Sequence, residues 1–95
     1  MSQIRITPQE LRGCANQCRA YGDEQQDLIQ KTQTLIDNLQ TQWEGQASRA
    51  YAEQFASLRP AYDRIRELYV ELSQQMDGAA TTMESVDAEI ASKFR

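Results

Sequence analysis

The residue types that most often do chemistry are scarce in this chain of 95 residues, which has no histidine and only two cysteines. Without histidine, Ser-His-Asp triads and imidazole acid–base catalysis are excluded. The sequence contains no glycine-rich phosphate-binding loop. Adjacent carboxylates such as Asp23 and Glu24 are typical of a solvated helix face. We therefore predict a protein that is not an enzyme and uses no cofactor.

The two cysteines, Cys14 and Cys18, are four residues apart, so in a helix their side chains lie on one face and run roughly parallel. This arrangement is poor for a disulfide between the two. We expect small buried apolar groups, with an intermolecular disulfide as the alternative. Two cysteines do not fill the four-ligand shell of zinc, so no metal site is predicted.

Charge and hydropathy exclude two classes of partner. Fourteen acidic and ten basic residues give a net charge of −4, and the basic residues form no stripe. Nucleic acid is therefore not an expected partner. The longest apolar run is only a few residues, whereas a membrane-spanning helix needs about 20. The Lys/Arg-rich face of a membrane-surface helix is also absent, so we expect no stable membrane insertion.

Helices are predicted to position these residues, because Gln, Glu, Ala, Leu and Arg dominate and no segment alternates with period two. Thr7-Pro8-Gln9-Glu10 matches a capping box with Thr7 at the N-cap. Apolar residues then recur every three or four positions, at Leu11, Cys14, Cys18, Tyr21, Leu28, Leu35 and Leu39. This pattern predicts a first helix over about residues 8–42, about 50 Å long.

A second apolar seam begins after Gly45 and predicts a helix over about residues 47–90. Its members are Ala47, Tyr51, Phe55, Leu58, Tyr62, Ile65, Tyr69, Leu72, Met76, Ala79, Met83, Val86 and Ile90. We expect Pro60 to kink this helix rather than to break it, because the apolar phase continues through it. Gly78 and the small residues after it weaken the helix, so a flexible tail is expected.

Two such helices joined at about residues 43–46 predict one all-α domain over residues 1–95, an antiparallel helical hairpin. A chain of this size gains only a few kcal/mol from its own core, and two helices do not cover both seams. We therefore expect dimerisation into a four-helix bundle. The residues predicted for the core and the dimer interface are Leu11, Cys14, Cys18, Leu28, Leu35, Leu39, Phe55, Leu58, Tyr62, Ile65, Tyr69, Leu72 and Met76.

The predicted turn contains Trp43-Glu44-Gly45, which includes the only tryptophan of the chain. Gly45 supplies the backbone freedom of a tight turn, and Trp43 can act as a packing plug at the end of the hairpin. A length near 100 residues, two helical halves and Trp-x-Gly at the midpoint together resemble the WXG100 (ESAT-6-like) family over the whole chain. The opening residues 1–8 also resemble homodimeric members from Gram-positive bacteria outside the mycobacteria.

This resemblance implies a dimer, formed with itself or with a sister WXG100 protein, that a type VII secretion system exports in the folded state. An FtsK/SpoIIIE-type ATPase drives such systems. In the family the turn of one protomer and C-terminal residues of the other form a composite export signal. By that correspondence Trp43, Glu44 and Gly45 are the predicted signal turn. The chain lacks the family's Tyr-x-x-x-Asp/Glu motif after the second helix, so the predicted C-terminal determinant is Val86, Asp87, Ile90 and Phe94.

The resemblance also implies a protein that is cytoplasmic before export and then extracellular or associated with the cell wall. Residues 1–7 lack the apolar core and cleavage site of a Sec signal peptide, which agrees with a different export route. The leading expectation is a secreted substrate, effector or co-secretion partner. The alternative is an intracellular adaptor or export chaperone that pairs with the helical N-terminal domain of a larger type VII toxin. The missing tyrosine motif favours that alternative.

Overall fold

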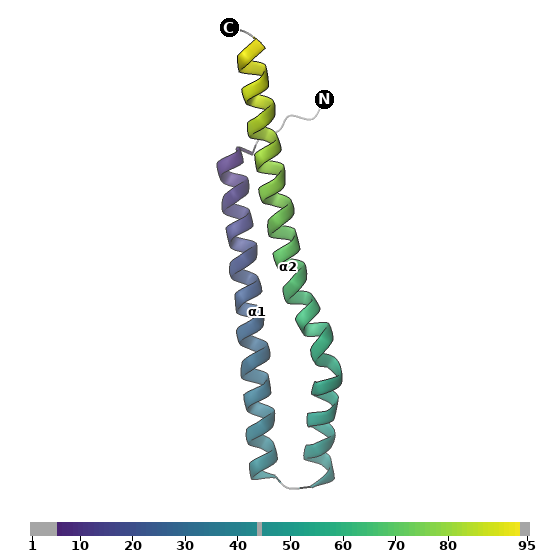
Figure 1. Cartoon of the computed structure of the whole chain (residues 1–95). Helices are drawn as coiled ribbons and strands as arrows, with labels where there is room; N and C mark the ends of the chain where they lie inside the picture. The colour runs from purple at the N-terminus through teal and green to yellow at the C-terminus, as the bar shows by residue number, and fades with distance from the viewer. Residues whose placement is uncertain (1–5, 44, 94–95) are drawn as a thin grey trace.

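The computed structural model describes residues 6–43 and 45–93, which form two long helices side by side (Figure 1). Helix α1 spans Pro8–Gln42 and helix α2 spans Gln46–Lys93. The two helices run in opposite directions from a short turn, and the molecule measures 76 × 20 × 17 Å. The protein is thus an all-α helical hairpin, as the apolar periodicity predicted.

Local signals account for both ends of α1. The Thr7 side chain accepts a hydrogen bond of 3.0 Å from the backbone N–H of Glu10, and Pro8 occupies the first turn. An N-cap hydroxyl satisfies one of the free N–H groups of the first turn. Proline lacks an N–H, which costs no hydrogen bond at this position because an N–H in the first turn has no partner within the helix. At the other end, the backbone N–H of Trp43 donates to the carbonyl of Leu39 at 2.8 Å. Helix α1 therefore stops directly at the tryptophan.

Helix α2 is continuous through Pro60 and continues past Gly78 to Lys93. It is longer than the predicted range of residues 47–90. Figure 1 shows α2 curved, farther from α1 near the turn than at the open end of the hairpin. Small residues explain the close approach, because a Cβ on Gly22 would lie only 3.4 Å from the Cβ of Tyr69. Nearer the turn, the large ring of Phe55 is buried between the helices.

The hairpin has a thin core of its own. The buried side chains among the described residues are small or polar except for Ile29 and Phe55, and the largest that are completely buried are Ser48 and Ser73. The Ser73 hydroxyl is satisfied within α2 by the carbonyl of Val70 at 2.6 Å. Small side chains remove little apolar surface from water, so this core contributes little hydrophobic stabilisation. Neither described helix is apolar enough over a sufficient length to cross a membrane.

Two helical glycines offer a test of this structure. A Cβ at Gly13 or Gly78 would meet no atom within 4 Å, so alanine adds helix propensity without a clash. We expect Gly13→Ala and Gly78→Ala each to raise the free energy of unfolding by about 0.5–1 kcal/mol. Gly45 has φ of +156°, so Gly45→Ala should instead destabilise by about 1–3 kcal/mol. Thermal unfolding followed by circular dichroism measures all three, and stabilisation by Gly45→Ala would contradict the turn geometry.

Candidate functional site

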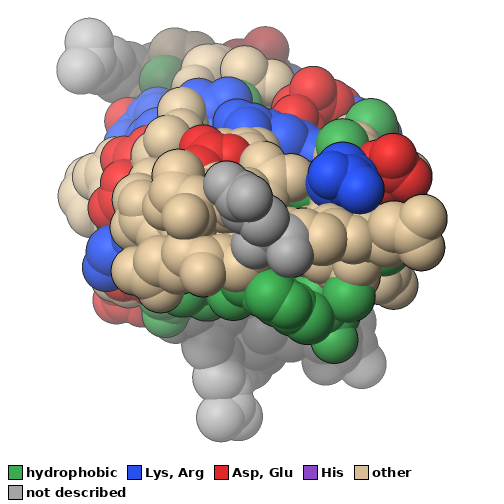
Figure 2. Space-filling model, turned by 90° about the horizontal axis from the view of Figure 1, so that it is seen from below, with side chains coloured by type: hydrophobic (Ala, Val, Ile, Leu, Met, Phe, Trp, Pro, Cys, Tyr) green, Lys and Arg blue, Asp and Glu red, His purple; other side chains and the backbone are tan. Residues whose placement is uncertain are grey.

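Most of the apolar side chains that the hairpin leaves exposed recur every seven residues on both helices. Most of them stand one position before a residue that faces the other helix. We call them the apolar face: Cys14, Tyr21, Leu28 and Leu35 on α1, and Tyr51, Leu58, Ile65, Leu72, Ala79 and Val86 on α2. Because α1 and α2 run in opposite directions, these positions fall on the same side of the hairpin. Figure 2 looks along the molecule from the turn end and shows hydrophobic side chains gathered mainly on one side.

The apolar face is extensive and contains a groove. Leu28 and Leu35 are 58% and 68% exposed, which is unusual for leucines that recur at regular spacing. A groove of about 280 Å³ opens between the helices beside Leu28, where Phe55 and Tyr62 form its opposite wall. A contiguous apolar surface with such a groove marks a site of protein interaction. We therefore regard the apolar face as the candidate binding surface.

The residues predicted as one core and interface set divide into two groups in the structure. Cys18 and Phe55 are buried between α1 and α2, and Leu11, Leu39, Tyr69 and Met76 are half-buried there. The exposed members are Cys14, Leu28, Leu35, Leu58, Tyr62, Ile65 and Leu72. Sequence reasoning missed the small buried residues Ala15, Gly22, Ser48, Ser73 and Ala80. Ala15 and Gly22 are seven residues apart, as are Ser73 and Ala80, and each follows a residue of the apolar face by one position. This spacing is the signal that could have found these four, and it does not include Ser48.

Charged pairs occupy the opposite side of the hairpin. Arg19 lies 2.9 Å from Asp77, and Arg12 lies 3.8 Å from Asp77 and also pairs with Glu84. Each of these charged residues comes one position after a residue that faces the other helix. The residues of the apolar face come one position before such a residue, so the charged pairs lie on the other side of the hairpin. Such half-exposed pairs each contribute about 0–1 kcal/mol. They join α1 to α2 near the open end of the hairpin.

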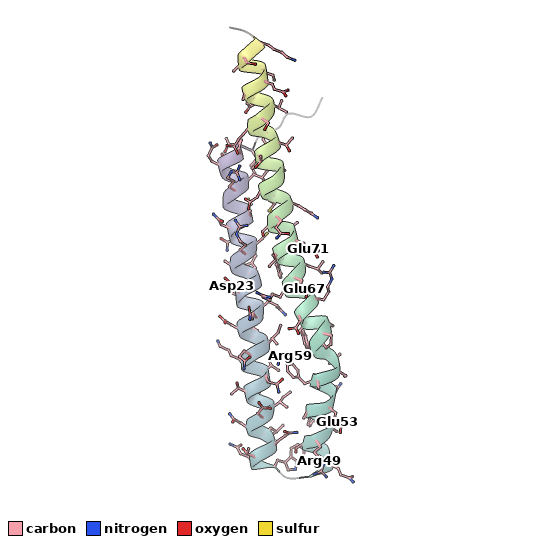
Figure 3. All side chains as sticks on the ribbon, viewed as in Figure 1. Asp23, Arg49, Glu53, Arg59, Glu67 and Glu71 are labelled. Carbon is pink, nitrogen blue, oxygen red and sulfur yellow. The ribbon has the colours of Figure 1, made fainter. Side chains whose placement is uncertain are left out.

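Polar side chains also enter the space between the helices. Arg59 lies on the side of α2 that faces α1 (Figure 3) and donates a hydrogen bond of 2.9 Å to Gln33 Oε1. Farther along α2, the Nε of Arg66 is buried with no hydrogen-bond partner. A buried donor without a partner is costly. Because polar groups occupy part of the space between the helices, the hairpin's own core contains less apolar volume.

The outer surface of α2 carries one perturbed titratable group. Arg64 donates hydrogen bonds to Glu71 at 2.9 Å and to Glu67 at 3.3 Å. These bonds, with that to Glu71 the larger influence, raise the pKa of the Arg64 guanidinium. Arginine is charged at every physiological pH, so this cluster of exposed charges performs no proton transfer.

The turn extends the apolar face to the end of the molecule. The indole of Trp43 lies 6.2 Å from the ring of Tyr51, which belongs to the apolar face, yet 43% of the tryptophan remains exposed. The carbonyl of Gly45 accepts a hydrogen bond from the N–H of Arg49 at 3.3 Å and so begins α2. Glu44, the third residue of the predicted signal turn, lies outside the described residues. Trp43 is thus packed on one side and free on the other.

At the open end, α2 extends past the beginning of α1 (Figure 1). A hollow of about 500 Å³ lies between the segment Ile6–Pro8 and α2, where Met83 and Val86 contribute to its lining. Val86 and Ile90 are about half exposed, and Asp87 is exposed beside them. Phe94, the last residue predicted for the C-terminal determinant, lies outside the described residues. The apolar end of α2 is therefore available for contact.

A helical hairpin with an exposed apolar face and a half-exposed tryptophan at its turn is the architecture expected of a small partner-binding protein. The family model described as proteins of 100 residues with WXG matches residues 3–88, and the chain belongs to this WXG100 family.

Relatives with names or solved structures are similar over nearly their whole length. The YukE protein of Bacillus subtilis is 39% identical over 95 residues, which cover 97% of this chain and 95% of that protein. The crystal structure of EsxA from Geobacillus thermodenitrificans has a TM-score of 0.84 at 36% identity, covering 96% of this chain and 98% of that one. The type VII secretion system extracellular protein A of Staphylococcus aureus is 24% identical over 94 residues, covering 99% of this chain and 97% of that protein.

Proposed function

We propose that a type VII secretion system exports this protein as a folded dimer, and that it acts outside the cytoplasm as a secreted substrate, effector or co-secretion partner. Membership of the WXG100 family supports the export route, and one relative is named as an extracellular protein of such a system. The observation that carries the proposal is the apolar face, which a lone hairpin leaves in water.

A second copy of the chain fits this face by its chemistry. The hairpin buries few large apolar side chains but leaves long rows of leucine, isoleucine and tyrosine exposed. Covering the exposed half of one leucine stabilises an assembly by about 1 kcal/mol. Two hairpins packed face to face cover both apolar faces and form a four-helix bundle. Dimerisation thus supplies the core that each hairpin lacks.

The distribution of charge favours an antiparallel arrangement of the two copies. In the open half, the described residues 6–26 and 67–93 carry nine acidic and three basic side chains. In the turn half, the described residues between 27 and 66 carry four acidic and five basic side chains. Parallel packing would bring the two acidic halves together, whereas antiparallel packing separates them. The turn of one copy then lies near the open end of the other.

Antiparallel packing brings the two predicted parts of the export signal together. Trp43 and Gly45 of one copy would lie beside Val86, Asp87 and Ile90 of the second copy, with Glu44 and Phe94 as the remaining predicted members. The exposed edge of Trp43 suits recognition, because tryptophan is enriched at binding hot spots. We assign this composite surface to the FtsK/SpoIIIE-type ATPase as its recognition site.

The test follows secretion from the native host with and without that ATPase. We expect the protein in the culture medium or cell wall only when the ATPase is present, with a mass by sedimentation of about twice 10.9 kDa. Retention in the cytoplasm in a stable complex with a larger toxin would instead support the adaptor function, which the missing tyrosine motif favours. A helical monomer at micromolar concentration would contradict the homodimer.

A further inference from the structure

Four sulfur-containing side chains of the described residues lie in one section of the hairpin. Helix α1 contributes Cys14 and Cys18, and α2 contributes Met76 and Met83. The Cys18 thiol lies between the helices and donates to the Met76 thioether, with 3.8 Å between the two sulfur atoms. Residues four apart on a helix are neighbours with about 5–6 Å between their Cβ atoms, so Cys14 stands one turn from Cys18 on the same face.

We propose that Cys14, Cys18 and Met76 form a binding site for one Cu(I) ion. Thiolate and thioether sulfurs are soft ligands that select Cu(I) over harder divalent ions. With metal–sulfur bonds of about 2.3 Å, two ligands of a trigonal site lie about 4.0 Å apart. The observed separation of Cys18 and Met76, 3.8 Å, is close to that value. Cys14 is exposed in the hairpin, so the ion has a direct path from solvent before a second copy covers the apolar face.

The same donor set discriminates against zinc. The part of the chain that the structure describes has no group of three or more His, Cys, Asp or Glu residues placed to hold a metal ion. Zinc prefers four ligands in a tetrahedron, and methionine is not among its usual ligands. Cu(I) accepts the thioether of Met76 as the third ligand. The site therefore fits a soft monovalent ion. One of its ligands, Cys14, belongs to the apolar face, so the site shares a boundary with the surface that the proposed dimer covers.

The binding step is a proton exchange without a change of oxidation state. Two thiols lose their protons to solvent as two Cu–thiolate bonds form, and the neutral Met76 sulfur adds a third bond. Affinity must therefore rise with pH in the range in which free thiols are protonated. Because the ligands come from both helices, Cu(I) binding links α1 to α2 and stabilises the folded hairpin by mass action.

The experiment titrates Cu(I) into the reduced, full-length protein under anaerobic conditions in competition with bicinchoninate. We expect one ion per chain, and a loss of affinity of at least about tenfold in both Cys14→Ser and Met76→Leu, since each variant removes a ligand. Cys14 is exposed, and Met76→Leu conserves volume, so both variants should fold. Met83→Leu is the matched control and should bind as the wild type does.

Three results would overturn the proposal. They are failure to compete with bicinchoninate, wild-type affinity in Met76→Leu, and a stoichiometry of one ion per two chains. The last would mean that Cys14 residues of two copies share an adventitious ion. Circular dichroism of each variant verifies that the helices are retained, so a lost affinity reports the ligand and not the fold.

Discussion

Replacing Leu72 with aspartate is expected to raise the Kd of the dimer about a thousandfold or more. Leu72 is 41% exposed on the apolar face, so the new carboxylate is in water in the hairpin and against apolar surface in the dimer. The lost leucine contact and the desolvated charge together cost at least about 2 kcal/mol per copy. A two-fold symmetric dimer contains the substitution twice, so the total cost to association is doubled. The released hairpins should also unfold at a lower temperature, because their own core is thin.

Matched variants show whether a change in the dimer Kd comes from the apolar face or from the added charge alone. Leu35→Asp tests the face from α1, because Leu35 is 68% exposed in the hairpin. Gln30→Asp adds the same charge to an exposed position of α1 outside the apolar face, and its Kd should stay within a few-fold of the wild type. Sedimentation equilibrium gives the three values. Wild-type association in both leucine variants would show that a second copy packs on another surface.

The ends of the helices could be predicted from the sequence because they depend on local chemistry. The Thr7 hydroxyl caps α1 through the N–H of Glu10, and a threonine–proline pair carries that signal in any context. At the turn, Gly45 adopts φ of +156°, which only glycine tolerates well. These features need no knowledge of the partner helix. The hairpin topology follows from them together with the two apolar seams.

Which seam faces inward could not be predicted from periodicity. Leu28 and Ile29 are adjacent, both belong to seven-residue repeats, and their directions on the helix differ by only about 100°. The apolar pattern assigns Leu28 to one combined core and interface set, and the structure of the hairpin buries the neighbouring Ile29 and leaves Leu28 exposed. Long helices approach closely only where residues are small, as at Gly22 beside Tyr69. The distance between the two helices depends on how α1 and α2 pack together, which the periodicity of one helix does not contain.

The end of α2 shows the same limit. Gly78 and the threonines after it have low helix propensity, which predicts a flexible tail. In the structure Ala80 is completely buried, and the Thr82 hydroxyl donates to the carbonyl of Gly78 at 3.1 Å. Packing of Ala80 and a hydrogen bond within the helix therefore offset the weak propensity of the segment. Intrinsic propensity is only a weak prior where a partner helix lies alongside.

Trp43→Ala is expected to reduce secretion to the level of cells that lack the ATPase, while the dimer persists. The indole is 43% exposed, and its ring contact is with Tyr51. Losing this aromatic pair costs the fold about 0.5–1.5 kcal/mol. Secretion is measured as the ratio of extracellular to cytoplasmic protein, and dimer mass by sedimentation. Gln42→Ala, at the adjacent exposed position, is the control and should be secreted as the wild type is.

Tyr51→Ala decides between the two roles of Trp43, because it removes the packing partner and retains the tryptophan. If Trp43 is a packing plug, both variants weaken the dimer to a similar degree, and secretion follows the amount of dimer. If Trp43 is part of the export signal, Tyr51→Ala is secreted in proportion to its dimer, whereas Trp43→Ala is not secreted even when fully dimeric. Equal secretion of the two variants at equal dimer content would refute the signal role. The half-exposed indole favours the signal role, because a side chain that served only to fill the end of the hairpin would gain most from complete burial.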